Sequence, residues 1–395
     1  MAFICKPRRA VALLAALLCM LPCRGLTAEP SLDELPRLHA CFTAMGAEPQ
    51  RYDMLVWQAR DKPLLPAARN AVPHVKAVMY RQLFFITSND VGDGATAATY
   101  DWVVKQHPDW LLRHTNGDLV NIPDYPQYWA IDPANTQWQS YWIAKTLSDV
   151  IGGGWDGVFI DDVLTTVAAH QLSGRPPLEG YPNDASLQAA VQQFLTRIYP
   201  VFQRQGKLVI LNVSDSDRYP GLLEQWLQVS DGYMEEHFAG DGWTWGDEVA
   251  TRQLEAMRLA AQRGKWMLCM TYGAWSDRGT MDQSMAAYLV GAQPNITWAY
   301  RPPGDGPVEG LGYPEWVREL GKPISEPERA GGLWRREFEA GRVVVNPTPQ
   351  PLTDQADGRN EVIESHGYRV WRRAGSAPAG DPTMSSMQDL FVKQK

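Results

Sequence analysis

The chain has 395 residues, a formal net charge of −8 and five cysteines. An acidic chain is a poor partner for nucleic acid or for an anionic membrane surface, and a neutral or cationic substrate suits it better. So few cysteines exclude a disulfide framework, and no Cys/His group has the spacing of a zinc site, so we expect no metal and no cofactor. The length suits one large α/β domain with a small appendage.

The first residues have the layout of a secretory signal peptide. A basic start precedes an apolar stretch from about residue 10 to residue 21, and small residues follow up to Ala28. We therefore expect cleavage after Ala28, over residues 1–28, and an exported protein that is periplasmic or secreted. The apolar stretch is too short for a permanent membrane span, and Pro22 before Cys23 fits a lipoprotein site poorly. Of the remaining cysteines, we expect Cys269 to be buried in a strand rather than bridged to Cys41.

From residue 52 onward the sequence alternates between short apolar runs and longer amphipathic segments. Runs bounded by Gly, Asp, Asn or Pro are typical of strands buried on both faces in a parallel sheet. The runs cover residues 52–59, 75–85, 129–132, 156–161, 207–214, 232–238, 265–273 and 295–301. Between them, helical patterns begin at Thr136, at Asp184 and at Asp247, with the two aspartates as expected N-caps.

Eight strands with intervening helices predict a (β/α)8 or TIM barrel over residues 29–325, and a doubly wound sheet is the alternative. After residue 325 the pattern changes to two strands across a turn at Ala340 and Gly341. This change predicts a small C-terminal β appendage over residues 326–374. Residues 375–395 lack a core pattern and predict a mobile tail.

The expected strands end in acids, amides and aromatic residues, and the active site of a barrel lies at these carboxyl ends. The sequence shows no nucleophile elbow and no phosphate-binding glycine loop there. Sugars present apolar faces that stack on Trp and Tyr, and hydroxyl groups that bond to Asp, Asn and Gln. We therefore expect a carbohydrate site. Its candidate substrate-binding residues are Trp57, Tyr80, Asp132, Asp162, Asn212, Glu235, Tyr272 and Trp298.

Glycosidic cleavage needs two carboxyl groups across the scissile bond. Asp161 and Glu236 are the natural pair, although each has an acidic neighbour, Asp162 and Glu235. Successive strand residues face opposite sides, and each favoured acid shares its face with the glycine four residues before it. The two would act as nucleophile or base and as general acid, in either order.

Four motifs in this order carry a family resemblance: "WAIDPANTQW", "GWDGVFIDDV", "DGYMEEHF" and "REFEAGRVVVNPTP". Over most of residues 50–350 the chain resembles the glycoside hydrolases grouped as hypothetical glycosyl hydrolase family fifteen. It is more distantly similar to the endo-α-1,4-polygalactosaminidase-like barrels. The resemblance implies a (β/α)8 barrel, export and action on polysaccharide. It also supports Asp161 and Glu236 as the catalytic pair, with Asp132 in the cleft.

We therefore predict an exported glycoside hydrolase that acts as a monomer on a polysaccharide or oligosaccharide. Two alternatives remain: a barrel that binds a glycan without cleaving it, and an enzyme that uses one carboxylate together with the acetamido group of an N-acetylated amino-sugar polymer. Release of product from a panel of glycans would separate an enzyme from a binding protein. Selectivity for N-acetylated sugars would indicate the substrate-assisted enzyme.

Overall fold

The computed structural model describes most of the chain after residue 51, together with the backbone of one earlier strand. The described residues are 38–40, 52–88, 94–123, 125–169, 176–214, 218–240, 246–274, 276–301, 317, 320–356 and 359–373. The expected signal peptide, Cys41 and the expected tail lie outside this part of the chain. Within it, no helix combines the length and the apolar character that crossing a bilayer requires.

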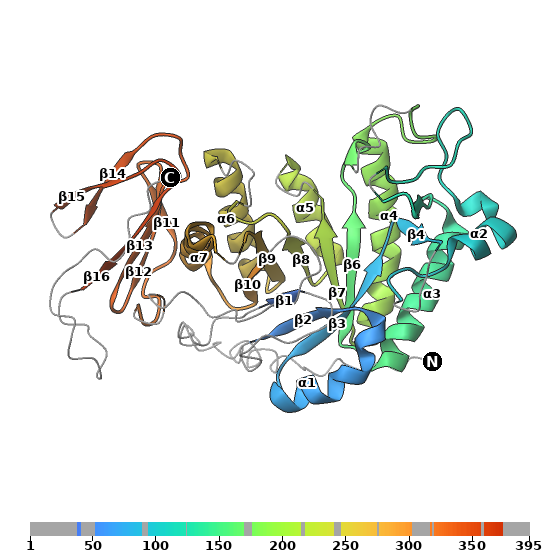
Figure 1. Cartoon of the computed structure of the whole chain (residues 1–395), viewed down its shortest axis with the longest axis horizontal. Coiled ribbons are helices and arrows are strands. Elements are labelled where there is room, and N and C mark those ends of the chain that lie inside the picture. Colours follow the sequence, from blue (N-terminus) through green and yellow to red (C-terminus); the bar gives the residue numbers. More distant parts are fainter. Residues whose placement is uncertain are drawn as a thin grey trace, which may run out of the picture.

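Eight parallel strands form one sheet in the order β1-β2-β3-β6-β7-β8-β9-β10. Its edge strands β1 and β10 contact each other, so the sheet curls into a nearly closed barrel (Figure 1). The predicted (β/α)8 barrel is confirmed. The strands are β1 (Leu38–Ala40), β2 (Met54–Trp57), β3 (Lys76–Gln82), β6 (Gly157–Val163), β7 (Leu208–Val213), β8 (Gly232–Glu235), β9 (Trp266–Tyr272) and β10 (Ile296–Arg301).

Helices follow the barrel strands and pack around them, as the alternating pattern predicts. They are η3 (Ala59–Leu64), α1 (Leu65–Ala71), α3 (Thr136–Gly153), α4 (Asp184–Gln203), α5 (Pro220–Trp226), η7 (Leu227–Val229), α6 (Asp247–Gln262) and α7 (Arg278–Gly291). The caps differ from the expected ones. Asn183 precedes α4 and accepts a hydrogen bond from the Ser186 amide at 3.0 Å, and Gly246 precedes α6.

One predicted barrel strand is wrong. Residues 129–132 overlap β5 (Tyr128–Ala130), which pairs antiparallel with β4 (Phe85–Thr87) outside the barrel sheet. The place of the missing strand is taken by β1, whose three residues are too few to show a pattern. The long connection from β3 to β6 is therefore an insertion that also holds α2 (Tyr100–Gln106) and η4 (Pro108–Trp110).

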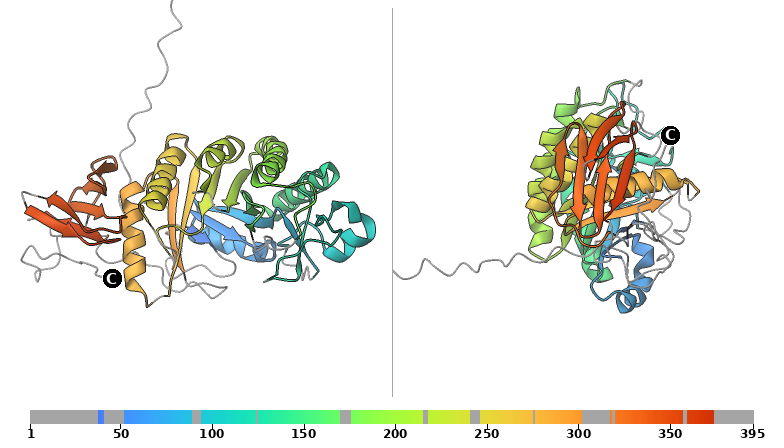
Figure 2. Two further views of the ribbon diagram at one scale, coloured as in Figure 1. Left: turned by 90° about the horizontal axis from the view of Figure 1, so that it is seen from above. Right: turned by 90° about the vertical axis from the view of Figure 1, so that its left-hand side faces the viewer.

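The C-terminal strands form separate sheets at one end of the molecule, opposite the end that carries α2 (Figure 2). The predicted hairpin is confirmed, because β12 and β13 pair antiparallel on both sides of Ala340. Buried Arg336 ties this sheet to α7 by donating to the carbonyl oxygen of Leu289 at 3.4 Å. The strands are β11 (Glu328–Ala330), β12 (Leu333–Phe338), β13 (Gly341–Val345), β14 (Leu352–Ala356), β15 (Arg359–Ile363) and β16 (Tyr368–Arg372).

The barrel interior is filled by side chains from alternate strand positions, including Phe159 and Met234. Two glycines on the same inward faces allow the strands to approach closely at the base. A Cβ on Gly157 would lie 2.3 Å from the carbonyl oxygen of Leu208, and a Cβ on Gly232 would lie 2.3 Å from that of Trp266. By alternation, the same inward faces carry Asp161 near the end of β6 and Glu236 directly after β8.

Gly157→Ala should destabilise the fold, because the clash is with backbone that cannot move aside. We expect a loss of roughly 1–3 kcal/mol or more in the free energy of unfolding, measured by urea denaturation. Gly152→Ala, on α3 with no heavy atom within 4 Å of its added Cβ, is the matched control and should be neutral or slightly stabilising. A Gly157→Ala variant as stable as this control would contradict the close approach of β6 and β7.

Candidate active site

One side-chain amide holds both predicted catalytic acids at the mouth of the barrel. Nδ2 of Asn212 on β7 donates to Oδ1 of Asp161 at 2.8 Å and to Oε2 of Glu236 at 2.8 Å. The two oxygens therefore lie at most twice that distance apart. The bridge forms because β7 stands between β6 and β8, so that inward side chains at the carboxyl ends of three neighbouring strands converge.

The other oxygen of Asp161 is held by two donors from β3. The Tyr80 hydroxyl donates to Oδ2, and Gln82 Nε2 donates to the same atom at 3.0 Å and to the Tyr80 hydroxyl at 2.7 Å. Gln82 pairs in register with Asp161 across the two strands. Gln82 was not among the predicted site residues, although it shares the strand face of Tyr80, and this alternation is the signal that would have found it.

Glu236 is held on its other side by Tyr272, which ends β9. The Tyr272 hydroxyl donates to Oε1 of Glu236 at 2.8 Å. The guanidinium carbon of Arg301 lies 5.8 Å from the centre of the Tyr272 ring, within the range of a cation–π interaction. Arg301 is buried at the end of β10. It was also missing from the prediction, because a cation at a strand end carries no mark of its role in the sequence.

Burial and crowded negative charge make Asp161 hard to ionise. Burial, followed by the nearby charges of Asp162 and Glu236, raises the pKa of Asp161 from 3.8 to about 7, against the opposing effect of the hydrogen bonds from Tyr80 and Asn212. Burial and the two aspartates also raise the pKa of the Tyr80 hydroxyl well above its ordinary value. Asp161 therefore exchanges its proton near neutral pH, where a catalytic carboxyl group is useful.

A β-bulge separates the two adjacent aspartates. The β6–β7 register shifts between Ile160 and Val163, and Asp162 has a φ of 53°, a left-handed conformation that is uncommon for a residue other than glycine. Bulges re-aim side chains next to active sites. The bulge keeps Asp161 in the mouth and places the charge of Asp162 close to it.

The structure does not bring the two predicted tryptophans to the carboxyl pair. Trp57 and Trp298 are 1% and 3% exposed and belong to the core between the barrel and its helices. The ring of Trp298 stacks against Tyr288 of α7, with 6.5 Å between ring centroids. Their neighbours Val56 and Ala299 face the barrel interior instead. Alternation along the strand therefore directs both indoles outward.

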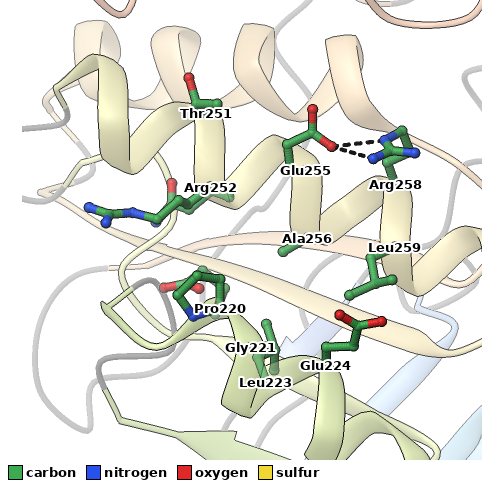
Figure 3. Close-up of a pocket in the computed structure, with 12 residues that line it drawn as sticks. Pro220, Gly221, Leu223, Glu224, Thr251, Arg252, Glu255, Ala256, Arg258 and Leu259 are labelled. Atoms are coloured by element: carbon green, nitrogen blue, oxygen red, sulfur yellow. Dashed lines mark hydrogen bonds and ion pairs between the residues drawn. The ribbon is translucent and has the colours of Figure 1, made fainter.

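Glu235 lies on the other side of the strand from its neighbour. It is buried and lines a pocket of about 410 Å³ between α5 and α6. Figure 3 shows the residues of the two helices on its walls, including the ion pair of Glu255 and Arg258. The pocket is on the outer side of the barrel, so Glu235 is separated from the site by its own strand.

Asp132 has a local role in the inserted segment. It follows β5, and its Oδ1 accepts hydrogen bonds from the Ala134 amide at 2.9 Å and from the Tyr181 hydroxyl. These contacts hold the turn that leads into α3. Neither of these contacts joins Asp132 to Asp161 or Glu236.

Comparison with known proteins places this chain in a family. The family model described as "Hypothetical glycosyl hydrolase family 15" matches residues 69–342. The chain belongs to this family. No curated protein matches it.

Solved structures with similar folds include glycoside hydrolases. The glycoside hydrolase domain of PelA from Pseudomonas aeruginosa is 13% identical with a TM-score of 0.44, and the match covers 69% of this chain and 96% of that one. An α-amylase from Anoxybacillus is 10% identical with a TM-score of 0.47, and the match covers 87% and 97%. Likenesses at these TM-scores do not bear on the reaction.

Asp161→Asn should stabilise the fold at high pH. The raised folded-state pKa means that the stability gained from the protonated Asp161 is fully present below about pH 4 and is lost as the pH rises through about 7. A side chain that cannot ionise avoids this loss. The Tm of the variant should therefore exceed that of the parent at about pH 8, and the gap should shrink at about pH 4. Asp118→Asn, at an exposed turn, should show no such gain; equal gains in both variants would refute the prediction.

Proposed function

We propose that this member of the family is a glycoside hydrolase that cleaves a polysaccharide or oligosaccharide, with Asp161 and Glu236 as the catalytic pair. The observation that carries the proposal is the shared amide of Asn212, 2.8 Å from an oxygen of each carboxyl group. Retaining enzymes hold their carboxyl groups about 5–5.5 Å apart, and inverting enzymes about 6.5–9.5 Å apart. A single bridging amide supports the shorter separation and a double displacement with retention.

Asp161 is the proposed nucleophile. Three side-chain donors hold its two oxygens, and such donors orient a carboxylate and favour its ionised form. Its carboxylate would attack the anomeric carbon and form a glycosyl ester, while Glu236 protonates the departing glycosidic oxygen. Glu236 would then remove a proton from the water molecule that hydrolyses the ester, which restores both groups.

The remaining polar residues position these two. Tyr80 and Gln82 orient Asp161, and Tyr272, backed by the cation of Arg301, orients Glu236. With Asp162 beside the pair, the mouth carries three acids, and the charges of Asp162 and Glu236 both act on Asp161. This charge favours a neutral or cationic glycan over an anionic one.

Substrate-assisted hydrolysis is the second candidate, because Asp161 and Asp162 are adjacent and the charge of Asp162 adds to the effect of burial on the pKa of Asp161. In that mechanism the acetamido oxygen of the sugar would attack the anomeric carbon, one aspartate would orient the acetamido group, and the other would protonate the departing oxygen. Glu236 would then not need to be held close by. The bridge through Asn212 to Glu236 favours the two-carboxylate mechanism. Hydrolysis confined to N-acetylated polymers would reverse this preference, and binding without any product would leave a glycan-binding barrel.

Replacing either catalytic acid should abolish most activity. The assay measures reducing ends released from starch, dextran, N-acetylated chitin, chitosan, α-1,4-polygalactosamine and alginate, and NMR gives the anomer of the first product. Asp161→Asn and Glu236→Gln should each lower kcat by about 10²–10⁴-fold, because each removes a group that reacts in the transition state. Glu235→Gln, on the outer side of the strand, is the matched control and should keep near-parental kcat. Full activity in both catalytic variants would sink the proposal.

The pH profile should show which acid must be ionised. If Asp161 is the nucleophile, kcat/KM should fall as the pH drops below about 7, where Asp161 takes up its proton. Asp162→Asn removes a charge that raises this pKa, so the acidic limb should move to lower pH, while Glu235→Gln should leave it in place. A rate that instead falls as the pH rises through about 7 would exchange the roles of Asp161 and Glu236.

A further inference from the structure

Tyr125 presents an aromatic ring to solvent from the insertion that follows β3. It is 56% exposed, and it is the one aromatic side chain among the large hydrophobic ones that the described residues leave exposed. The others are Leu64, Val104, Ile151, Ile324 and Val362. An exposed ring that is also held in place is a feature of binding surfaces, because little entropy is lost when a ligand contacts it.

The backbone and a neighbouring ring hold Tyr125 in place. Its amide donates to the carbonyl oxygen of Ile122 at 3.2 Å, and its own carbonyl oxygen accepts from the Tyr128 amide at 2.9 Å. The rings of Tyr125 and Tyr128 meet edge to face, with 6.2 Å between centroids. The Tyr128 ring rests in turn on the buried ring of Phe85, at 6.4 Å and 86°. The exposed tyrosine is thus the outer member of a packed series that reaches the core.

This series lies beside the catalytic mouth. Phe85 begins β4 only three residues after Gln82, which bonds to Asp161. Tyr128 lies close enough to Tyr80 to influence its hydroxyl electrostatically, and Tyr80 donates to Asp161. Loops at the carboxyl ends of barrel strands build the substrate site. The β4–β5 ladder is therefore placed to contact a chain that passes through the mouth.

The opposite face of the same ladder is occupied by the protein itself. Trp129, next to Tyr128 on β5, stacks on Tyr100 of α2 with 4.6 Å between centroids. Successive strand residues face opposite sides. The ladder thus packs one face against α2 and turns Tyr128 to the face of Phe85, where Tyr125 extends the aromatic surface outward.

We propose that Tyr125 and Tyr128 form an aromatic subsite that stacks on a pyranose ring of the bound glycan, beyond the two rings whose glycosidic bond is cleaved between Asp161 and Glu236. The proposal rests on the proposed function for the identity of the ligand. The apolar C–H face of a pyranose matches the exposed face of a tyrosine ring, and the phenol hydroxyl bonds to sugar hydroxyl groups. A subsite off the catalytic pair adds affinity for long chains and not for the reacting sugar alone.

Binding to an inactive enzyme tests the subsite without hydrolysis. The Asp161→Asn variant is run in native gels that contain α-1,4-polygalactosamine, chitosan or starch. The slower migration of the protein with increasing polymer concentration gives its affinity for the polymer. Introducing Tyr125→Ala into the Asp161→Asn variant should weaken its affinity for the polymer it binds about three- to tenfold. Adding Tyr125→Phe should preserve it, because the ring remains. Val104→Ala removes an exposed apolar side chain on α2 of the same insertion and should change nothing. Equal affinity with and without the Tyr125 ring, or no retardation of Asp161→Asn by any of the polymers, would overturn the subsite.

Kinetics of the active enzyme separate this subsite from the catalytic proposal. Tyr125→Ala should raise KM for the polymer about three- to tenfold and leave kcat unchanged. On a disaccharide of the same sugar, which is too short to reach the subsite, parent and variant should be equal. A parent that cleaves nothing while Tyr125 still governs retardation would refute the hydrolase and leave the subsite standing. A change in kcat with KM unaffected would assign Tyr125 to the chemistry and overturn the subsite.

Discussion

The hydrogen bonds from Asn212 to two carboxyl groups are the constraint on which this site depends. Two acids held close together repel each other when both are ionised, and a donor between them offsets part of that repulsion. The amide can serve both only because β7 lies between β6 and β8 and because all three side chains face inward at the same end of the barrel. Burial, together with the charges of Asp162 and Glu236, raises the pKa of Asp161, so the ionised carboxylate is kept here at a cost in stability.

Several features of the barrel support this arrangement. Gly157 and Gly232 allow close approach of the strands at the base, four residues before each acid. The bulge at Asp162 changes the direction of the last residues of β6. The positive φ of Asp162 is a local backbone strain, and the pairing of β6 with its neighbours keeps it in place. Tyr80 and Tyr272 brace the two acids from opposite sides, each from a strand on the far side of its acid from Asn212. The pair is thus held by neighbours on three barrel strands, β3, β7 and β9.

The two additions to the barrel differ in what they contribute. The insertion after β3 projects from the catalytic end and brings an aromatic surface near Tyr80. The four-stranded C-terminal sheet is bound to α7, on the other side of β10 from the barrel interior, through contacts such as those of buried Arg336. On the proposed function, the first addition is placed to affect which glycan binds. The second extends the core behind the last helix.

The sequence by itself determined the barrel, because buried parallel strands read as short apolar runs between helical patterns. It also determined which acid of each pair shares the inward face, since alternation along a strand is a local property of the chain. It did not reveal β1, whose three residues carry no pattern, and it misplaced residues 129–132, because a short apolar run looks the same in any sheet.

Only the tertiary structure decided which strand-end residues meet. Trp57 and Trp298 are next in sequence to Val56 and Ala299, which face the barrel interior. Because side chains alternate along a strand, both tryptophans point into the outer core instead of into the mouth. Gln82 and Arg301 were not predicted, although they share the inward strand faces of Tyr80 and Ala299. The bridge through Asn212 joins residues far apart in the chain, so nothing local in the sequence records it. The bridge depends on the order of the strands in the sheet and on the position along the barrel axis at which each strand ends. Both are properties of the assembled barrel sheet.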